Sequence, residues 1–354
     1  MERERHDEDA PAPGSLAHDL GTRARAAAHA VLHPGTATAP AIVPRTAPPT
    51  PCGCPRPLVL ADRADGTVVR CGPVVAKAHA PDADPAGLDA RLALAASPAL
   101  AGVLLPPLPG SPGPPAPGPR APGPAARTRD GRAVSLWPYG EPVDPDDPDA
   151  APWEEAAGLL ARLHLTAPPH PLPPMRGPVK AALAVARMGA ARPGEPVTGP
   201  VLAAWHALPG WARGEAAAPP RRAGFLCHGD LHLGQLVRDP SPYGSWLLID
   251  VDDAGLGDPA WDLARPAAWY AAGLLAPDVW SRFLAAYRAA GGPAVPASGD
   301  PWAHLDVPAR ALTVQTAALA LAKSAAEQRI PDEVEQMVID ACARMAAVPP
   351  ELTA

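Results

Sequence analysis

Polar side chains interrupt an otherwise apolar part of this chain between residues 227 and 250. Residues 227–237 read C-H-G-D-L-H-L-G-Q-L-V, so Asp230 and Gln235 fall in a segment with the character of a buried strand and loop. An unpaired buried polar group costs roughly 1–3 kcal/mol, so such side chains need a structural partner or a chemical task. A second apolar run, W-L-L-I, ends at Asp250. Carboxylate and amide oxygens in this combination are ligands that Mg²⁺ accepts in proteins.

These residues can be assigned to the parts of a phosphoryl-transfer site. Such a site needs a cation on the donor phosphates, oxygen ligands for Mg²⁺ and a carboxylate beside the attacking hydroxyl. Lys77 ends the strand V-V-A-K, from which its ammonium can reach the α- and β-phosphates of ATP. Asp230 lies in a loop, where a carboxylate can accept a hydrogen bond from a substrate hydroxyl, and Gln235 and Asp250 supply the oxygen ligands. The sequence therefore predicts an enzyme that uses ATP and Mg²⁺.

The same segment resembles a known family. The motifs H-G-D-x-x-x-x-Q at 228–235, I-D-V-D at 249–252 and G-D-P-A-W-D-L-A at 257–264 are similar to those of the aminoglycoside phosphotransferase and choline-kinase-like superfamily. That superfamily has a protein-kinase-like fold, and the resemblance extends over roughly residues 57–345. It implies a phosphotransferase that acts on a hydroxyl of a small molecule, either an aminoglycoside-like amine or a sugar.

The resemblance implies a role for each matching residue. Asp230 is the expected catalytic base or the group that orients the hydroxyl, Asp250 a metal ligand and Lys77 the phosphate anchor. The two aspartates of the last motif, Asp258 and Asp262, are expected to brace loops rather than to react. G-D-P at the start of a helix is also an ordinary N-cap signal, which gives the same two residues a purely structural explanation.

The connector W-P-Y-G-E matches the hinge of the family, where backbone groups usually meet adenine. Trp137, Tyr139 and Glu141 are therefore the expected nucleotide contacts. His228 is expected to support the site through hydrogen bonds rather than to carry a proton. The helix after Lys77 has no glutamate, which leaves Asp89 as the one candidate to pair with that lysine.

The chain also departs from the family pattern in two places, the loop that carries the expected metal ligand Gln235 and the phosphate loop. Gln235 stands where asparagine is usual. Glutamine offers the same amide oxygen on one more methylene, and the maltokinase-like branch of the family resembles this chain in its H-G-D-L-H-L-G-Q loop. The stretch R-A-D-G-T, between the first two strands, is poor in glycine for a phosphate loop. The presence of glutamine in place of asparagine at position 235 therefore predicts a working metal site with an altered ligand.

Other functions fit the same residues less well. A nucleotide-binding pseudokinase, which would keep the fold as a scaffold without turnover, is disfavoured because Asp230 and Asp250 are both present. A protein kinase is disfavoured because Gly229 replaces the arginine of H-R-D and no A-P-E segment follows. A zinc site made of His228, Asp230 and His232 lacks a third histidine or cysteine at ligand spacing.

Composition excludes further classes of function. The formal net charge of −7 argues against nucleic acid as the main partner, because phosphate contacts favour a basic face. Five cysteines without framework spacing are typical of reduced thiols and indicate a cytoplasmic protein. The charged N-terminus lacks the apolar region of a secretion signal. The alanine- and leucine-rich run near 311–322 is too short and too polar to span a membrane. None of these features determines the oligomeric state.

The order of apolar patterns predicts an α+β layout of two lobes, with a small β-rich N-lobe and a large helical C-lobe, and the family resemblance implies that this layout is a protein-kinase-like fold. The expected division is a flexible arm over 1–50 with one short helix around 20–32, an N-lobe over 51–137 with a Pro/Gly-rich insertion at 106–126, a hinge over 138–142 and a C-lobe over 143–354. The C-lobe would carry the catalytic loop, the metal site and the substrate-binding helices.

The motifs do not identify the acceptor. The C-terminal part of the chain has an acidic run, which would suit a cationic amine such as an aminoglycoside, and several tryptophans, which would suit a sugar. The acidic residues are Glu327, Asp332, Glu333 and Glu335, and the tryptophans are Trp205, Trp211, Trp261 and Trp269. An acidic run is also typical of a solvated helix face. Both acceptor classes therefore stay open at the level of the sequence.

Overall fold

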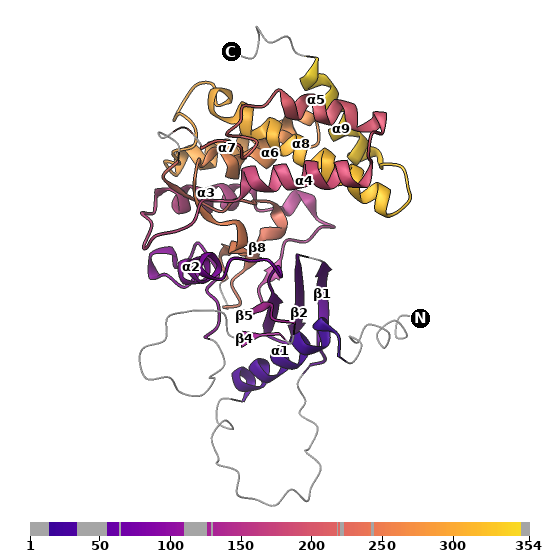
Figure 1. Cartoon of the computed structure of the whole chain (residues 1–354). Helices are drawn as coiled ribbons and strands as arrows, with labels where there is room; N and C mark the ends of the chain where they lie inside the picture. Colours follow the sequence, from indigo (N-terminus) through magenta and orange to yellow (C-terminus); the bar gives the residue numbers. More distant parts are fainter. Residues whose placement is uncertain are drawn as a thin grey trace, which may run out of the picture. The chain divides into compact units, whose positions relative to one another are not determined.

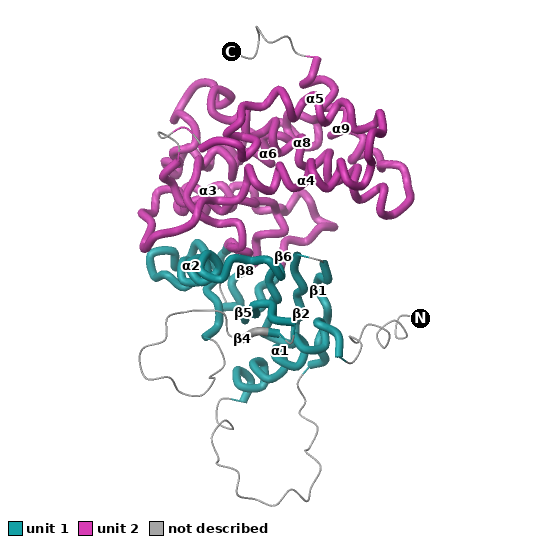
Figure 2. The backbone as a smooth tube through the Cα atoms, in the orientation of Figure 1, with its two compact units in different colours: residues 1–141, 238–247 teal, residues 142–237, 248–354 magenta. Residues whose placement is uncertain are grey.

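The chain divides into two compact units that are not contiguous in sequence. The computed structural model describes residues 14–33, 55–63, 65–109, 126–128, 130–217, 219, 223–241 and 244–347. Unit 1 comprises residues 1–141 and 238–247, and unit 2 comprises 142–237 and 248–354 (Figure 2). A C-lobe running unbroken from 143 to 354 was expected, but residues 238–247 belong to unit 1. Two strands that pair with each other, Leu236–Arg238 and Trp246–Leu248, run into this stretch, and an apolar pattern alone does not report where such strand ends pack.

Unit 1 is built on an antiparallel five-stranded sheet with the strand order β1-β2-β3-β5-β4. Alternate side chains of the second and third strands are buried, as the period of two in a strand requires. Val74, Ala76 and Ala78 of the third strand point into the core, and Lys77 lies on the opposite face. The strands are β1 (Leu58–Arg63), β2 (Gly66–Cys71), β3 (Val74–Ala78), β4 (Ala126–Arg127) and β5 (Ala133–Pro138).

Helix α1 (Leu16–Leu32) covers the core face of this sheet (Figure 1). Leu20, Ala24 and Ala28 recur every four residues, so they share one side of the helix, and all three are completely buried. Ser15 caps the first turn by accepting a hydrogen bond from the N–H of His18. The predicted helix around 20–32 is confirmed and begins four residues earlier, but the stretch is part of the core of unit 1 and not of a flexible arm. The rest of the predicted arm up to residue 50 lies outside the described residues.

A second helix of unit 1, α2 (Pro85–Ala95), follows the sheet strand that carries Lys77. Asp84 caps its first turn at the N–H of Gly87, and Pro85 occupies the first helical position. Asp89, the sequence candidate for pairing with Lys77, is exposed on this helix. A short 3₁₀ turn, η1 (Pro98–Leu100), comes next. Most of the predicted Pro/Gly insertion, residues 110–125, lies outside the described residues.

Unit 2 is a group of helices around α8, which packs against α4, α5, α6 and α9 (Figure 1). Alanines at 311, 317 and 318 are buried on α8 and allow the neighbouring helices to approach closely. Helices α3 and α7 form a second packed pair. The helices are α3 (Trp153–Leu165), α4 (Gly177–Ala191), α5 (Gly199–His206), α6 (Ala260–Ala272), α7 (Pro277–Ala289), α8 (Trp302–Ala326) and α9 (Glu333–Ala346). No helix in the described ranges has the length and apolarity needed to cross a membrane.

Short strands and 3₁₀ turns hold the loops between these helices. β7 pairs antiparallel with β10, and a three-stranded sheet has the order β6-β8-β9. The strands are β6 (Glu141–Pro142), β7 (Phe225–Cys227), β8 (Leu236–Arg238), β9 (Trp246–Leu248) and β10 (Gly255–Gly257). The 3₁₀ turns are η2 (Pro148–Ala150), η3 (Pro196–Thr198), η5 (Leu233–Gln235) and η6 (Val251–Asp253). All the motifs found at 228–264 sit on these strands, on the turns between them and on the start of α6.

Candidate active site

The H-G-D loop begins where strand β7 ends, and its shape depends on Gly229. This residue has φ +85, in the left-handed region that side chains disfavour. A Cβ added here would lie 2.3 Å from the backbone oxygen of Asp253. The backbone of the loop therefore packs directly against the η6 turn, and no arginine of an H-R-D motif could occupy this position. Asp230 is the next residue of the loop after this contact.

Asp262, in the first turn of α6, holds the H-G-D loop in place. Its carboxylate accepts hydrogen bonds from the backbone N–H groups of His228 at 2.6 Å and Gly229 at 2.7 Å. The Nε2 of His164, on α3, lies 2.9 Å from the same carboxylate. Burial opposes ionisation of this side chain, but the hydrogen bonds from His164 and Gly229 hold the pKa of Asp262 below its ordinary value. This is the geometry that a loop-bracing carboxylate needs.

His228 joins the H-G-D loop to the end of strand β9. Its side chain is fully buried, and its Nε2 lies 2.7 Å from the backbone oxygen of Ile249. A carbonyl oxygen can only accept, so Nε2 carries the proton and donates it to that hydrogen bond. His232, four residues on, accepts a hydrogen bond at Nδ1 from the N–H of Gly234, and burial lowers its pKa to about 4. Both histidines have structural partners in the loop.

The carboxylate of Asp230 lies between two cations of unit 2. Its Oδ2 is 2.6 Å from the Nζ of Lys180, on α4, and its Oδ1 is 2.8 Å from the guanidinium of Arg265, on α6. Burial favours the neutral acid, yet the attraction of Lys180 and Arg265 outweighs it and holds the pKa of Asp230 far below its ordinary range. Asp230 is therefore ionised at every physiological pH.

Sequence reasoning missed both of these cations. Lys180 lies fifty positions before Asp230 in the chain, and only the small number of lysines in the sequence marked it out. Its ammonium also lies 2.7 Å from Asp253, a residue to which the sequence gave no role. Arg265 follows the D-L-A motif directly and donates a second hydrogen bond, of 3.1 Å, to the backbone oxygen of Leu231.

The two expected magnesium ligands are carried by neighbouring backbone segments. The backbone oxygen of Gln235, in η5, accepts a hydrogen bond of 2.9 Å from the N–H of Ile249, the residue before Asp250. Gln235 is buried, and the carboxylate of Asp250 accepts a hydrogen bond from the N–H of Asp252. Asp250 itself has φ +62 and ψ +75, a left-handed backbone conformation.

This conformation supports the assignment of a functional site. A left-handed backbone at a residue other than glycine costs on the order of 1–3 kcal/mol and persists where the surroundings impose it, which is common at ligand sites. An amide and a carboxylate as oxygen donors fit Mg²⁺. The side chains of Gln235 and Asp250 therefore offer the oxygen donors that the ion accepts, and the left-handed backbone of Asp250 is of the kind found at ligand sites.

The expected nucleotide contacts belong to unit 1. Lys77 on β3 pairs in register with Ser135 on β5, on the sheet face opposite α1. Trp137 is on the same face of β5, and its Nε1 donates a 2.7 Å hydrogen bond to the hydroxyl of Ser135. Tyr139 stacks under the guanidinium of Arg70, 3.4 Å from the ring centroid, and Glu141 is exposed at the start of β6.

A buried cluster of His164, Cys227 and Asp262 has ligand atoms close enough together to suggest a metal site. Hydrogen bonds already use both nitrogens of His164, with Asp262 at 2.9 Å and with the hydroxyl of Tyr287 at 2.7 Å. Burial raises the pKa of Cys227 well above its ordinary value, so without a metal ion the residue is a thiol. We interpret the cluster as the internal support of the H-G-D loop.

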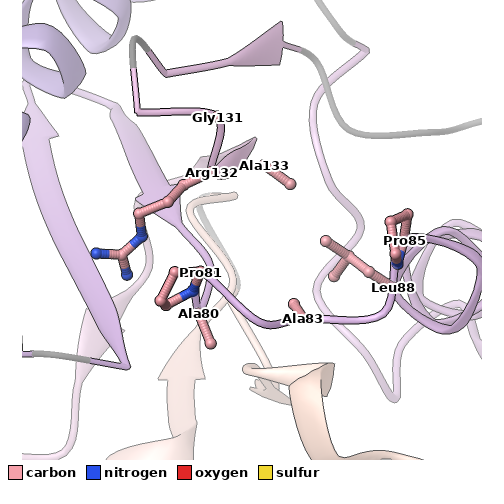
Figure 3. A pocket seen from close by; sticks show the side chains of 8 residues that line it. All are labelled: Ala80, Pro81, Ala83, Pro85, Leu88, Gly131, Arg132 and Ala133. Atoms are coloured by element: carbon pink, nitrogen blue, oxygen red, sulfur yellow. The ribbon is translucent and has the colours of Figure 1, made fainter.

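Unit 1 also has a small hollow between the segment after β3, the start of α2 and the turn before β5 (Figure 3). It has a volume of about 20 Å³, room for little more than a water molecule. Its lining residues are Ala80, Pro81, Ala83, Pro85, Leu88, Gly131, Arg132 and Ala133. None of them belongs to the sequence motifs, so this hollow is not the active site.

Comparison with known proteins supports the kinase-like architecture. The model of the phosphotransferase enzyme family matches residues 68–302. A choline/ethanolamine kinase family protein from Mesorhizobium loti superposes with a TM-score of 0.53 at 16% identity, over 94% of this chain and 97% of that one. A thermostable mutant of the aminoglycoside phosphotransferase APH(4)-Ia, in a ternary complex with AMP-PNP and hygromycin B, gives a TM-score of 0.52 at 15% identity, over 84% and 95%.

At these identities the structural matches establish the fold alone. An N-terminal antiparallel sheet followed by a largely helical region is confirmed as a kinase-like fold. No curated protein matches the chain. The match to the family model covers both the lysine strand and the three motifs between 228 and 264.

Proposed function

Because the chain belongs to the phosphotransferase enzyme family, whose members include small-molecule kinases with alcohol acceptors, we propose that it transfers the γ-phosphoryl group of ATP to a hydroxyl of a small molecule with the help of Mg²⁺. The observation that carries this proposal is the setting of Asp230. Its carboxylate is ionised, partly buried and fixed at the end of a loop that Asp262 braces. A carboxylate fixed in this way can accept a hydrogen bond from the attacking hydroxyl.

Within that reaction Asp230 acts by orienting the hydroxyl rather than by removing its proton early. A general base works best when its pKa lies near the operating pH, and the pKa of Asp230 is held far below it. Phosphoryl transfer has a loose transition state and gains mainly from positioning and electrostatic stabilisation. Of the two roles that the family resemblance allows for Asp230, the low pKa favours orientation.

Gln235 and Asp250 are the residues that would hold Mg²⁺. When bound, the ion would neutralise the negative charge of the phosphate oxygens. The chain's own contribution is to present an amide and a carboxylate from the η5 turn and from the left-handed residue that precedes η6. On the nucleotide side, Lys77 would pair with the phosphates, and Trp137, Tyr139 and Glu141 would line the adenine end.

The acceptor is more consistent with a neutral, sugar-like molecule than with a polyamine. Three of the four residues in the acidic run that would suit an amine have local partners. Arg329 binds Glu327 at 2.6 Å and Glu335 at 2.7 Å, while Asp332 caps α9 at the N–H of Glu335. These three carboxylates have local partners that a cationic substrate would have to displace, and of the four residues of the run this leaves the exposed Glu333.

A screen for ADP release tests the proposal. The purified protein is incubated with ATP and a panel of neutral sugars, hydroxylated amines and aminoglycosides, with and without Mg²⁺. We expect Mg²⁺-dependent release with at least one acceptor, and release that is slower by about 10²–10⁴-fold in Asp230→Asn. Failure of every acceptor, together with binding of ATP, would instead support the catalytically silent scaffold.

A further inference from the structure

Lys180 is the feature of unit 2 that the functional assignment leaves unexplained. It is the fourth residue of α4, and its ammonium lies 2.6 Å from Asp230 and 2.7 Å from Asp253. Its side chain is 27% exposed, so solvent reaches the bridge only partly. The attraction of the two carboxylates outweighs burial and raises its pKa, so the lysine stays charged. Arg176, one turn earlier, lies 3.7 Å from the other oxygen of Asp253.

A purely stabilising role does not account well for such a bridge. Removing charges from water costs several kcal/mol per ion, and buried ion pairs are often no more stabilising than apolar residues of similar volume. The position of the bridge instead indicates a role in the candidate active site. Asp253 is in η6, directly after the Asp250 turn, and its backbone oxygen packs on Gly229 of the H-G-D loop. Lys180 thus connects helix α4, the η6 turn and Asp230.

We propose that Lys180 is a positioning residue for Asp230. It fixes one carboxylate oxygen from the side of α4 while Arg265 fixes the other from α6. A carboxylate has about four lone-pair sites, so each oxygen keeps one for the acceptor hydroxyl. Asp253 anchors the lysine and makes the orientation of Asp230 depend on the turn that follows Asp250, the proposed metal ligand. This inference rests on the proposed phosphotransferase function and adds a residue to its mechanism.

The test compares Lys180→Met, Lys180→Arg and a control, Lys323→Met, in the full-length protein. Lys323 is exposed on α8 and is the one other lysine of unit 2. With the best acceptor of the screen, Lys180→Met should lower kcat by roughly 10²-fold, the usual effect of misplacing a positioned group, while KM for Mg·ATP changes little. Lys180→Arg should recover at least about tenfold of that loss because it keeps the charge, and Lys323→Met should match the wild type.

The pH profile separates positioning from mere structural support. In the wild type, Asp230 stays ionised throughout the assay range, so kcat/KM has no acid limb from this group. Without Lys180 its pKa rises, and activity should fall as the pH drops toward 5 in Lys180→Met but not in Lys323→Met. If Lys180→Met does not fold, as judged by circular dichroism, Asp253→Asn serves instead. This substitution removes the carboxylate that anchors Lys180 and should also lower kcat.

The outcomes distinguish the positioning role of Lys180 from the proposed phosphotransferase function. Wild-type kcat and an unchanged pH profile in Lys180→Met would overturn the role of Lys180 and leave the phosphotransferase proposal intact. A loss of kcat that Lys180→Arg does not recover, with no change in the acid limb, would also overturn it. A wild-type protein that phosphorylates no acceptor would overturn the proposed function and, with it, the positioning role.

Discussion

Replacing Asp262 with asparagine should destabilise the protein and loosen its catalytic loop. In the wild type one buried carboxylate accepts hydrogen bonds from the N–H groups of His228 and Gly229 and from the ring of His164, at 2.6, 2.7 and 2.9 Å. An asparagine amide keeps one oxygen and turns its own NH₂ group toward these donors. At least one buried donor therefore loses its acceptor.

The size of the effect follows from these contacts. A hydrogen bond to a charged group contributes about 1.5–3 kcal/mol, and a buried donor left unsatisfied costs about 1–3 kcal/mol. Since Asp262 is 1% exposed, water cannot replace the lost acceptor. We expect the free energy of unfolding to fall by about 3–5 kcal/mol, as for other broken buried charge pairs. For a unit of this size, the melting temperature should drop by roughly 10 °C.

Guanidinium unfolding followed by circular dichroism measures this loss. Asp278→Asn is the matched control because Asp278 is exposed in the first turn of α7, where the change should cost less than about 1 kcal/mol. The pKa of Asp262 is lowered on folding, so its stabilisation is fully present above the unfolded value of about 4 and is lost as the pH falls through the folded value. The gap between wild type and variant should therefore narrow below about pH 4. A loss under about 1 kcal/mol at pH 7 would refute the bracing role.

Two further changes test other parts of the structure. Leu20→Ala, in the helix that covers the sheet of unit 1, should lower the free energy of unfolding by about 2–5 kcal/mol, whereas the exposed Leu32→Ala should change it little; equal effects in a urea titration would argue against the packing of α1. Gln235→Asn should keep substantial activity, while Gln235→Leu should raise the Mg²⁺ concentration needed for half-maximal turnover, because only the amide oxygen can reach the metal. An unchanged Mg²⁺ requirement in Gln235→Leu would exclude the amide as a ligand.

The parts of the site that sequence could predict are local in the chain. His228, Asp230 and Gln235 lie within eight residues, so their spacing alone places them in one loop, and Asp250 ends the next apolar strand. Their backbone arrangement follows, since the N–H of Ile249 bonds to Gln235 and the side chain of His228 bonds to Ile249. The order of a β-rich part and a helical part was predictable for a related reason, since strands with a period of two precede helices with a period near four along the chain, and the motifs at 228–264 identified this order as a kinase-like fold.

What escaped prediction depends on contacts between distant residues. Nothing in the alanine-rich sequence around Lys180 shows that its ammonium meets two aspartates 50 and 73 positions away. Helix α1 looked like part of an arm because its alanines carry a weak apolar signal, although they pack closely on the sheet. The local partners of the acidic run also escaped prediction, because a sequence does not reveal that Arg329 and the N-terminus of α9 engage Glu327, Asp332 and Glu335.

The most direct test of the central claim follows the phosphorus atom itself. ³¹P nuclear magnetic resonance of a reaction with ATP, Mg²⁺ and the best acceptor of the screen distinguishes transfer to a hydroxyl from hydrolysis. The account predicts a phosphomonoester signal that grows with ADP in the wild type and is weaker by about 10²–10⁴-fold in Asp230→Asn, the range for loss of a positioned catalytic group. A phosphomonoester formed equally fast by Asp230→Asn, or inorganic phosphate as the sole product of the wild type, would contradict it.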